Sequence, residues 1–316
     1  RETPMCDLKQ KFTEWQKWLF GDDIHSIQKQ IHAMIWDSAV FQAINEARLY
    51  APVDEEKNPE LNGMVHGFID HCFFQTQSLA IRRLLDTEQR TGEKEVYSLA
   101  RLVLDMEKNR ALSTRGNILA ALDYPYDCAD GVSELHRRII RQEQPGDLVR
   151  CKFSQSMHEA IDILTGVQAK KRSPEDCIPE KVILWLKGRL ESCREIGTYV
   201  NKFVAHAATP ESRAVIDAKG IRVTLGKLYE AHRIICETSH FIGLNFFNHS
   251  MGNFLVTCAY DQFEHFEKPW ASQETMVKLR ESWSQYDKET RKWNNWDWKG
   301  EFSKVSGADR TVKGKK

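Results

Sequence analysis

The stretch that decides the fold runs from Pro179 to His206 and reads PEKVILWLKGRLESCREIGTYVNKFVAH. Its apolar residues recur at steps of three or four, the spacing that gives one stripe along an α-helix. Proline is favoured at the first helical position, because its missing N–H would be unpaired there in any case. The pattern predicts one long helix over 179–206, with an apolar stripe that comprises Val182, Leu186, Leu190, Cys193, Ile196, Val200 and Phe203.

Polar residues follow a second face of the same predicted helix. Glu195, Tyr199, Lys202 and His206 are separated by steps of four, three and four, so they stack along one side. Histidine titrates near neutral pH and is the side chain best suited to moving protons. Pro210 follows closely and takes the chain out of the helix. The end of this helix is therefore the first candidate for a functional site.

Three segments together resemble one known family. Residues 201–206 read NKFVAH, residues 80–86 read AIRRLLD and residues 97–103 read YSLARLV. This combination is similar to the HEPN superfamily, in particular to its abortive-infection branch. The family signature is an arginine followed by four to six residues and a histidine, often written Asn-Lys-x-x-Ala-His at its end. The resemblance covers roughly residues 22–245 and implies an all-α fold, a helical bundle of HEPN type with additional flanking helices.

The resemblance also implies an activity, namely metal-independent endoribonuclease cleavage in a phage-defence or stress system. His206 matches the family histidine, and Asn201 matches the polar residue beside the family arginine. Lys202 is the nearest positive charge, so the expected catalytic residues are His206, Lys202 and Asn201. Tyr199, Arg194 and Arg213 are the expected RNA-binding residues. No metal or cofactor is expected, and the family site implies a homodimer with RNA as substrate.

One part of the signature is absent. An arginine at the allowed spacings would stand at Tyr199, Val200 or Asn201, and none of these is arginine. Lysine is a point charge and lacks the bidentate fork of arginine, so Lys202 would be a poorer phosphate clamp. This departure leaves an alternative, in which the chain is a catalytically inactive HEPN-fold module that binds RNA or a protein partner. A helical interaction protein without any RNA role is a third alternative.

Arginines near the two shorter motifs admit two interpretations. Arg82, Arg83 and Arg101 can pair with neighbouring carboxylates at the surface, as most such charges do. They can instead form a basic rim that contacts a phosphate backbone. Other sites are less favoured: His66 and His71 are five residues apart, a poor spacing for two metal ligands on one helix face. The chain also lacks a Walker loop, a Gly-x-Ser-x-Gly elbow and a Gly-x-Gly-x-x-Gly turn.

Composition bounds the class of protein. The 316 residues are 41% hydrophobic and 28% charged, and the formal net charge is +0. No bulk basic charge favours nucleic acid, so an RNA site must be a local patch. The sequence has no apolar run of about 18 residues, no signal-peptide core at its start and no Cys-x-x-Cys pair among its eight cysteines. These features predict a soluble cytoplasmic protein with no membrane partner.

The rest of the chain is expected to be mostly helical. Ser98, Ser113 and Thr224 are the expected N-caps of three helices. A short strand is expected at 254–258. Four regions are predicted: an N-terminal helix over 1–21, the HEPN-like domain over 22–245, an aromatic-rich extension over 246–306 and a disordered tail over 307–316.

Overall fold

The computed structural model describes residues 4–58, 60–88, 96–127, 145–204, 208–218, 222–268 and 272–294. All regular structure in these residues is helical, and the expected strand at 254–258 is wrong, because that segment consists of bends and irregular chain. Among the described residues, an antiparallel bridge joins Thr114 to Cys177. The all-α prediction is therefore confirmed. The chain forms two compact units, residues 1–256 and residues 257–316.

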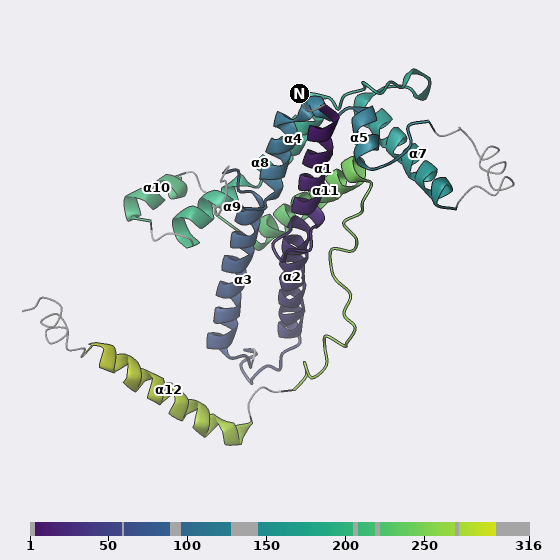
Figure 1. Ribbon diagram of the computed structural model, residues 1–316. Helices are drawn as coiled ribbons and strands as arrows, with labels where there is room; N and C mark the ends of the chain where they lie inside the picture. Colours follow the sequence, from purple (N-terminus) through teal and green to yellow (C-terminus); the bar gives the residue numbers. More distant parts are fainter. Residues whose placement is uncertain are drawn as a thin grey trace, which may run out of the picture. The chain divides into compact units, whose positions relative to one another are not determined.

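Figure 1 labels most of the α-helices of the first unit in chain order. This unit contains α1 (Pro4–Phe20), α2 (Ile27–Leu49), α3 (Gly63–Leu84), α4 (Leu99–Lys108), α5 (Arg115–Ala121), α7 (Pro145–Thr165), α8 (Glu180–Glu191), α9 (Arg194–Tyr199), a π-helix (Val200–Val204), α10 (Pro210–Ala218) and α11 (Leu225–Phe247). The second unit contains α12 (Gln273–Asn294). None of the described helices combines the length and the apolar character needed to cross a membrane.

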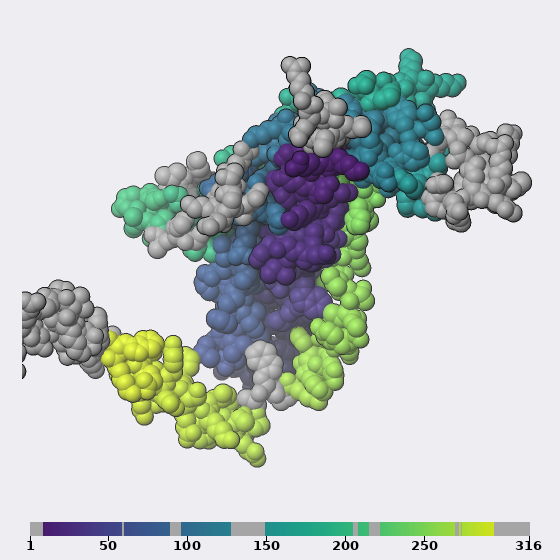
Figure 2. Space-filling model, viewed as in Figure 1, coloured from purple at the N-terminus to yellow at the C-terminus, as the bar shows by residue number. Residues whose placement is uncertain are grey.

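The core of the first unit is organised on α11. Helices α1, α2, α3, α7 and α8 all pack against it, and its residues Leu228, Ile235 and Phe246 are fully buried. Helix α1 fills the centre of the visible face in the space-filling view (Figure 2). It contributes buried aromatic rings, of which Phe12 lies 5.6 Å from Phe247 between ring centroids. Burial of such rings supplies much of the apolar area that stabilises a helical bundle.

Side chains at the N-termini of the helices supply the caps that the sequence predicted, with one shift. Ser98 accepts a hydrogen bond from the backbone N–H of Arg101, and Thr224 accepts one from Lys227. Helix α5 is capped by Thr114 and not by Ser113, because Thr114 has the extended backbone that an N-cap requires. The carbonyl of Ser113 instead accepts a hydrogen bond from the N–H of Ile178 at 3.0 Å.

The predicted single helix over 179–206 is wrong, because the chain bends after Glu191. Pro179 precedes α8 as an extended N-cap, and Ser192 and Cys193 form a turn before α9 begins. The hydroxyl of Ser192 donates to the carbonyl oxygen of Arg189 at 2.6 Å, a local bond that competes with the helical ladder. A π-helix then replaces the regular helix from Val200 to Val204.

The apolar stripe of this stretch keeps its role despite the bend. Six of its seven residues are buried: Val182, Leu186, Leu190, Cys193, Ile196 and Val200. They face the helices that enclose this stretch, since α4 and α11 pack on α8 and α3 packs on α9. Phe203 is the exception and is 37% exposed, because the wider turn of the π-helix moves it out of register with the stripe.

A buried ionic cluster joins α5 to α7 and to the connection before α8. The side chain of Arg115 has 0% exposure and pairs with Asp162 at 2.7 Å and with Asp176 at 2.9 Å. Its Nη1 also donates to Nδ1 of His158 at 3.1 Å, while Nε2 of His158 lies 3.0 Å from the carbonyl oxygen of Tyr126. The neutral imidazole with its proton on Nε2 satisfies both contacts.

The same cluster shifts two pKa values. Burial raises the pKa of Asp162, but hydrogen bonds from Arg172 and Arg115 outweigh burial and hold it below its usual value. Burial lowers the pKa of His158, and the nearby charge of Arg115 lowers it further. Both shifts favour the charge states in which the cluster is fully hydrogen-bonded.

Candidate functional site

The expected site residues come from three consecutive elements. Arg194 begins α9 and Tyr199 ends it, while Asn201 and Lys202 belong to the π-helix. Arg213 lies on α10. His206 lies outside the described residues, which stop at 204 and resume at 208.

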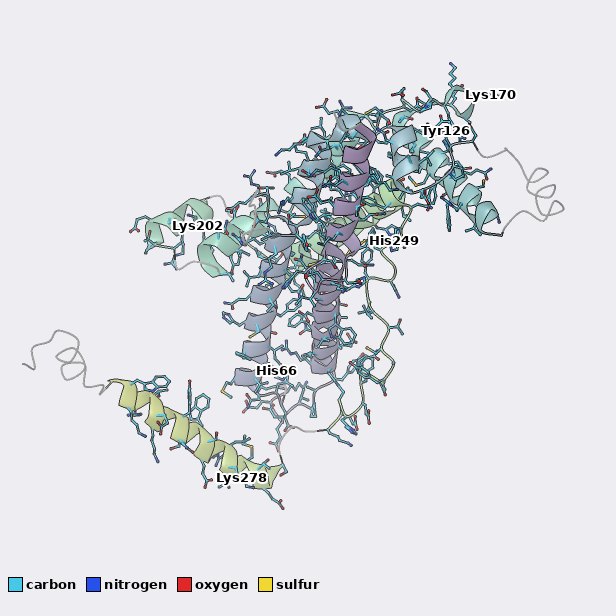
Figure 3. All side chains as sticks on the ribbon, in the orientation of Figure 1. His66, Tyr126, Lys170, Lys202, His249 and Lys278 are labelled. Carbon is cyan, nitrogen blue, oxygen red and sulfur yellow. The ribbon has the colours of Figure 1, made fainter. Side chains whose placement is uncertain are left out.

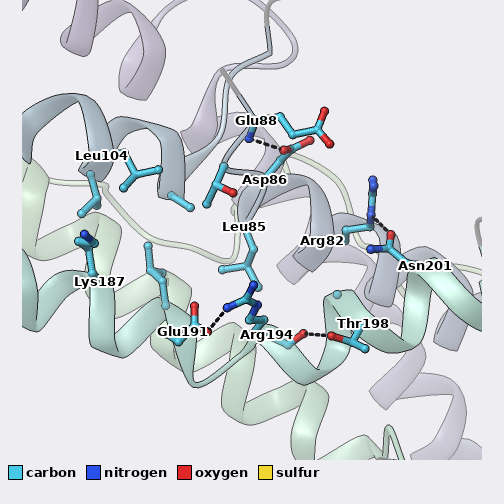
Figure 4. Close-up of a pocket in the computed structure, with 15 residues that line it drawn as sticks. Arg82, Leu85, Asp86, Glu88, Leu104, Lys187, Glu191, Arg194, Thr198 and Asn201 are labelled. Atoms are coloured by element: carbon cyan, nitrogen blue, oxygen red, sulfur yellow. Dashed lines mark hydrogen bonds and ion pairs between the residues drawn. The ribbon is translucent and has the colours of Figure 1, made fainter. Parts of the chain in front are cut away.

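A groove runs between the end of α3, α4, α8 and α9, with a volume of about 420 Å³. Figure 4 shows its lining side chains converging from these elements. Arg194 and Asn201 line it, as the sequence led us to single out, and so does Arg82 of α3. We call it the α3–α9 groove; its charged and polar lining residues are Arg82, Asp86, Thr87, Glu88, Lys187, Glu191, Arg194, Thr198 and Asn201.

The closest contact across the α3–α9 groove joins Arg82 to Asn201. The Nε atom of Arg82 donates to Oδ1 of Asn201 at 2.6 Å, between residues 119 positions apart in the chain (Figure 4). Each of the two residues belongs to one of the family-like segments, AIRRLLD and NKFVAH. The structure thus places a guanidinium beside Asn201, although the helix that carries Asn201 has no arginine at the family spacing.

The charges of the α3–α9 groove are mixed. Lys187 binds both carboxylate oxygens of Glu107 at 2.8 Å, and Arg194 binds Glu191 at 2.6 Å. The hydrogen bond from Arg194 to Glu191 raises the pKa of Arg194.

The helical register explains which residues reach the α3–α9 groove. Arg194, Thr198 and Asn201 are spaced by four and three residues and share one face. Glu195 lies on another face and accepts a hydrogen bond from Nζ of Lys227 at 2.7 Å. Lys187 and Glu191 also line the groove. The sequence did not predict them as site residues, because nothing in their spacing distinguishes them from the charged residues on any solvent-exposed helix face.

Three expected site residues lie away from the groove. The ring of Tyr199 stacks on Phe203 with centroids 4.9 Å apart, and the amine of Lys202 donates to Oγ of Ser212 at 2.6 Å. Figure 3 labels Lys202 beside α10. Arg213, on α10, is not among the groove residues. The structure therefore brings together Arg194 and Asn201, and separates them from Tyr199, Lys202 and Arg213.

A second hollow adjoins the α3–α9 groove. It has a volume of about 430 Å³ and is lined by Arg83, Asp86, His25 and Tyr97, among others. Asp86 lines both the α3–α9 groove and this second hollow. Of the two adjacent arginines, Arg82 lines the groove and Arg83 lines the second hollow.

Arg101 lines neither the α3–α9 groove nor the second hollow. It is buried, with its guanidinium 4.6 Å from the ring of Trp18 and its Nη1 donating to the carbonyl oxygen of Val96 at 2.8 Å. The expectation that Arg101 lies at the surface is wrong, because α4 packs on α1 and brings this residue against Trp18. A cation over an indole ring is a favourable arrangement.

Comparisons with protein-family models, with curated proteins and with solved structures found no match to this chain. The resemblance to the HEPN superfamily therefore rests on the three sequence segments alone. Among the described residues, no group of three or more His, Cys, Asp or Glu side chains is arranged to hold a metal ion.

Proposed function

We propose that this chain is a HEPN-like endoribonuclease that cleaves RNA without metal, and that Arg82 takes the place of the missing motif arginine. In such a reaction the ribose 2′-oxygen loses a proton and attacks phosphorus. The bond to the 5′-oxygen breaks and that oxygen gains a proton, which leaves a 2′,3′-cyclic phosphate. His206 would move the protons, and a cation must stabilise the charge that builds on the phosphate oxygens.

The observation that carries the proposal is the hydrogen bond from Arg82 to Asn201. It uses Nε and so leaves the two terminal nitrogens of the guanidinium pointing elsewhere for a bidentate contact with phosphate. Arg82 also lines the α3–α9 groove, so RNA in this groove would meet the guanidinium directly. This placement supplies an arginine to the segment that leads to His206 without requiring one at 199–201.

Arg83 and Arg194 support RNA as the ligand. Arg194 lines the α3–α9 groove and Arg83 lines the adjoining hollow. Both side chains are exposed, so each can reach a phosphate backbone that lies along the surface.

The test is cleavage of total RNA by the full chain in the presence of EDTA. We expect fragments that end in 2′,3′-cyclic phosphate, and we expect them to disappear with His206→Ala, since general acid–base help is worth about 10²–10⁴-fold. Cleavage that requires a divalent cation, or that His206→Ala leaves unchanged, would contradict the proposal.

The second candidate is an inactive HEPN-fold module that binds RNA or a protein partner. Two observations favour it: Val200, at an allowed arginine position, is fully buried in the core, and the amine of Lys202 is bound to Ser212. RNA binding that depends on Arg82, Arg83 and Arg194, without any cleavage product, would select this candidate over the nuclease.

A further inference from the structure

Helix α12 of the second unit has an apolar face that the described residues of that unit leave uncovered. Met276, Leu279, Trp283, Tyr286 and Trp293 lie on this face and Val277 lies beside it, each between 37% and 68% exposed. Figure 3 draws side chains standing out on both sides of this helix. Single exposed apolar residues are normal on a protein surface, but five of them on one face of one helix form a patch of the kind that marks an interaction site.

The spacing of these residues indicates what covers them. They lie at steps of three, four, three and seven, and Thr290 completes the series of alternating three- and four-residue steps. This is the a and d pattern of a heptad repeat, which keeps one narrow seam facing a partner helix. We call this set of six positions the α12 seam. A helix that packs into a globular core would show a wider apolar face.

We propose that two copies of this chain associate by pairing their α12 helices in antiparallel orientation along the α12 seam. In this register Trp283 of each copy packs on Tyr286 of the other. Met276 packs on Trp293 of the second copy, and Leu279 packs on Thr290. Each layer then joins an a position to a d position, as antiparallel helix pairs do, and the two-fold axis passes between the Trp283 and Tyr286 layers.

The charges beside the α12 seam favour the antiparallel orientation. Leu279 and Tyr286 occupy d positions, and Arg280 and Asp287 directly follow them in the sequence. The antiparallel pair therefore sets Arg280 of one copy against Asp287 of the other. The two-fold axis repeats this pair on the other side of the dimer. On the other edge of the α12 seam, Ser282 of one copy faces Glu289 of the other, so no two like charges face each other. A parallel pair would set Trp283 against Trp283 and would bring no opposite charges together beside the seam. Edge charges of this kind set partner choice and orientation.

The polar face of α12 argues for a protein partner over a lipid surface. The helix carries five basic and four acidic residues, whereas a helix that lies on a membrane has a polar face rich in lysine and arginine. Several of these charges pair within α12, for example Arg291 with Asp287 at 2.9 Å and Lys292 with Glu289 at 2.7 Å. Such pairs support the helix itself and leave the seam as the surface available to a second copy.

The test is sedimentation of the full chain over a series of concentrations. We expect a shift from one copy to two, and we expect Trp283→Ala to raise the dissociation constant of the dimer by at least about tenfold, since a buried tryptophan is a typical anchor of an interface. The matched control is Lys288→Ala, which lies on the opposite side of α12 and should leave the dissociation constant unchanged. Monomer at every concentration, or a dimer that tolerates Trp283→Ala, would overturn the proposal.

Charge reversal tests the orientation. Arg280→Asp alone and Asp287→Arg alone should each weaken the dimer, and the two changes together should restore it, because the pair is re-formed with its signs exchanged. Failure of the double variant to recover would overturn the antiparallel register. A second experiment measures sedimentation of the chain with vesicles of anionic lipid. A chain that stays monomeric and binds the vesicles through Trp283 would overturn the dimer and identify a membrane surface as the partner of the α12 seam. None of these readouts depends on RNA cleavage.

Discussion

The guanidinium of Arg82 donates to the amide oxygen of Asn201 at 2.6 Å, which joins the last turn of α3 to the π-helix. The two residues belong to different family-like segments and lie on different helices, yet they meet at the rim of one groove. Arg82 is the residue on which the proposed activity most depends.

Arg82→Ala should abolish RNA cleavage in EDTA, or reduce it at least about 10²-fold, because it removes the cation proposed to stabilise the phosphate. Arg82→Lys should retain a fraction of the activity, since lysine keeps the charge and loses the fork. Thermal unfolding should change little for either variant, because the contact lies at the surface. Lys202→Ala is the comparison. A larger loss of activity there than in Arg82→Ala would return the phosphate-stabilising role to Lys202.

Arginine placed at two of the three allowed family positions, Val200 and Asn201, should affect stability differently. Val200 is fully buried, so Val200→Arg should cost several kcal/mol of unfolding free energy, about 3–5 kcal/mol, through an unpaired buried charge. Asn201 is exposed, so Asn201→Arg should fold normally, and it restores an arginine with four residues between it and the histidine. Chemical denaturation measures both. Equal stability of the two variants would show that Val200 is not enclosed as described.

The buried ionic cluster should be essential for stability. Arg115→Ala removes the cation that Asp162 and Asp176 share, although Asp162 keeps Arg172, and should destabilise the fold by roughly 3–5 kcal/mol. The control is Arg150→Ala. Arg150 pairs with Asp123 at 2.7 Å, with a side chain that is 46% exposed, and its loss should cost at most about 1 kcal/mol. Urea unfolding of the three proteins would show whether the two arginines differ in this way.

His232 should make the fold sensitive to acid. Burial lowers its pKa from 6.5 to about 4. Between pH 4 and pH 6.5, therefore, His232 is protonated in the unfolded chain and neutral in the folded chain. Stability contributed by the neutral ring is present above pH 6.5 and is lost as pH falls toward 4, by roughly 3 kcal/mol in all. His232→Leu should flatten this part of the stability curve.

The matched control for His232 is Ile235→Val, on the same helix and fully buried. It should lower the free energy of unfolding by about 0.5–1.5 kcal/mol at every pH and leave the slope as in the wild type. A His232→Leu curve with the wild-type slope would assign the acid sensitivity to other groups.

Two glycines within helices should respond oppositely to alanine. A Cβ on Gly243 would lie 2.6 Å from the carbonyl oxygen of His249 and 3.0 Å from Cζ of Phe20, because the chain folds back on α11 after its left-handed end at Asn248. Gly243→Ala should therefore destabilise the fold by about 1–3 kcal/mol. A Cβ on Gly188 would meet nothing within 4 Å, and Gly188→Ala should stabilise α8 by about 0.5–1 kcal/mol. Melting temperatures would decide.

Local features of the structure could be predicted from the sequence. The helical class, the caps at Ser98 and Thr224 and the buried stripe from Val182 to Val200 depend on residues a few positions apart, so spacing alone reveals them. Two of the errors are also local in origin: the one-residue shift from Ser113 to Thr114, and the bend at Ser192, whose hydroxyl competes for the carbonyl oxygen of Arg189.

Tertiary packing decided the features that join distant parts of the chain. The hydrogen bond between Arg82 and Asn201 spans 119 residues, and the contact of Arg115 with Asp176 spans 61. No periodicity predicts such pairs, because an arginine on a helix face has the same local sequence whether it meets water, a carboxylate or an indole, as Arg101 does. The sequence by itself determined the all-α class and most of the buried stripe from Val182 to Val200, because these depend on local spacing. The charged side chains that share a groove were decided by how those helices pack, since burial and pairing of charge depend on neighbours that only the folded chain supplies.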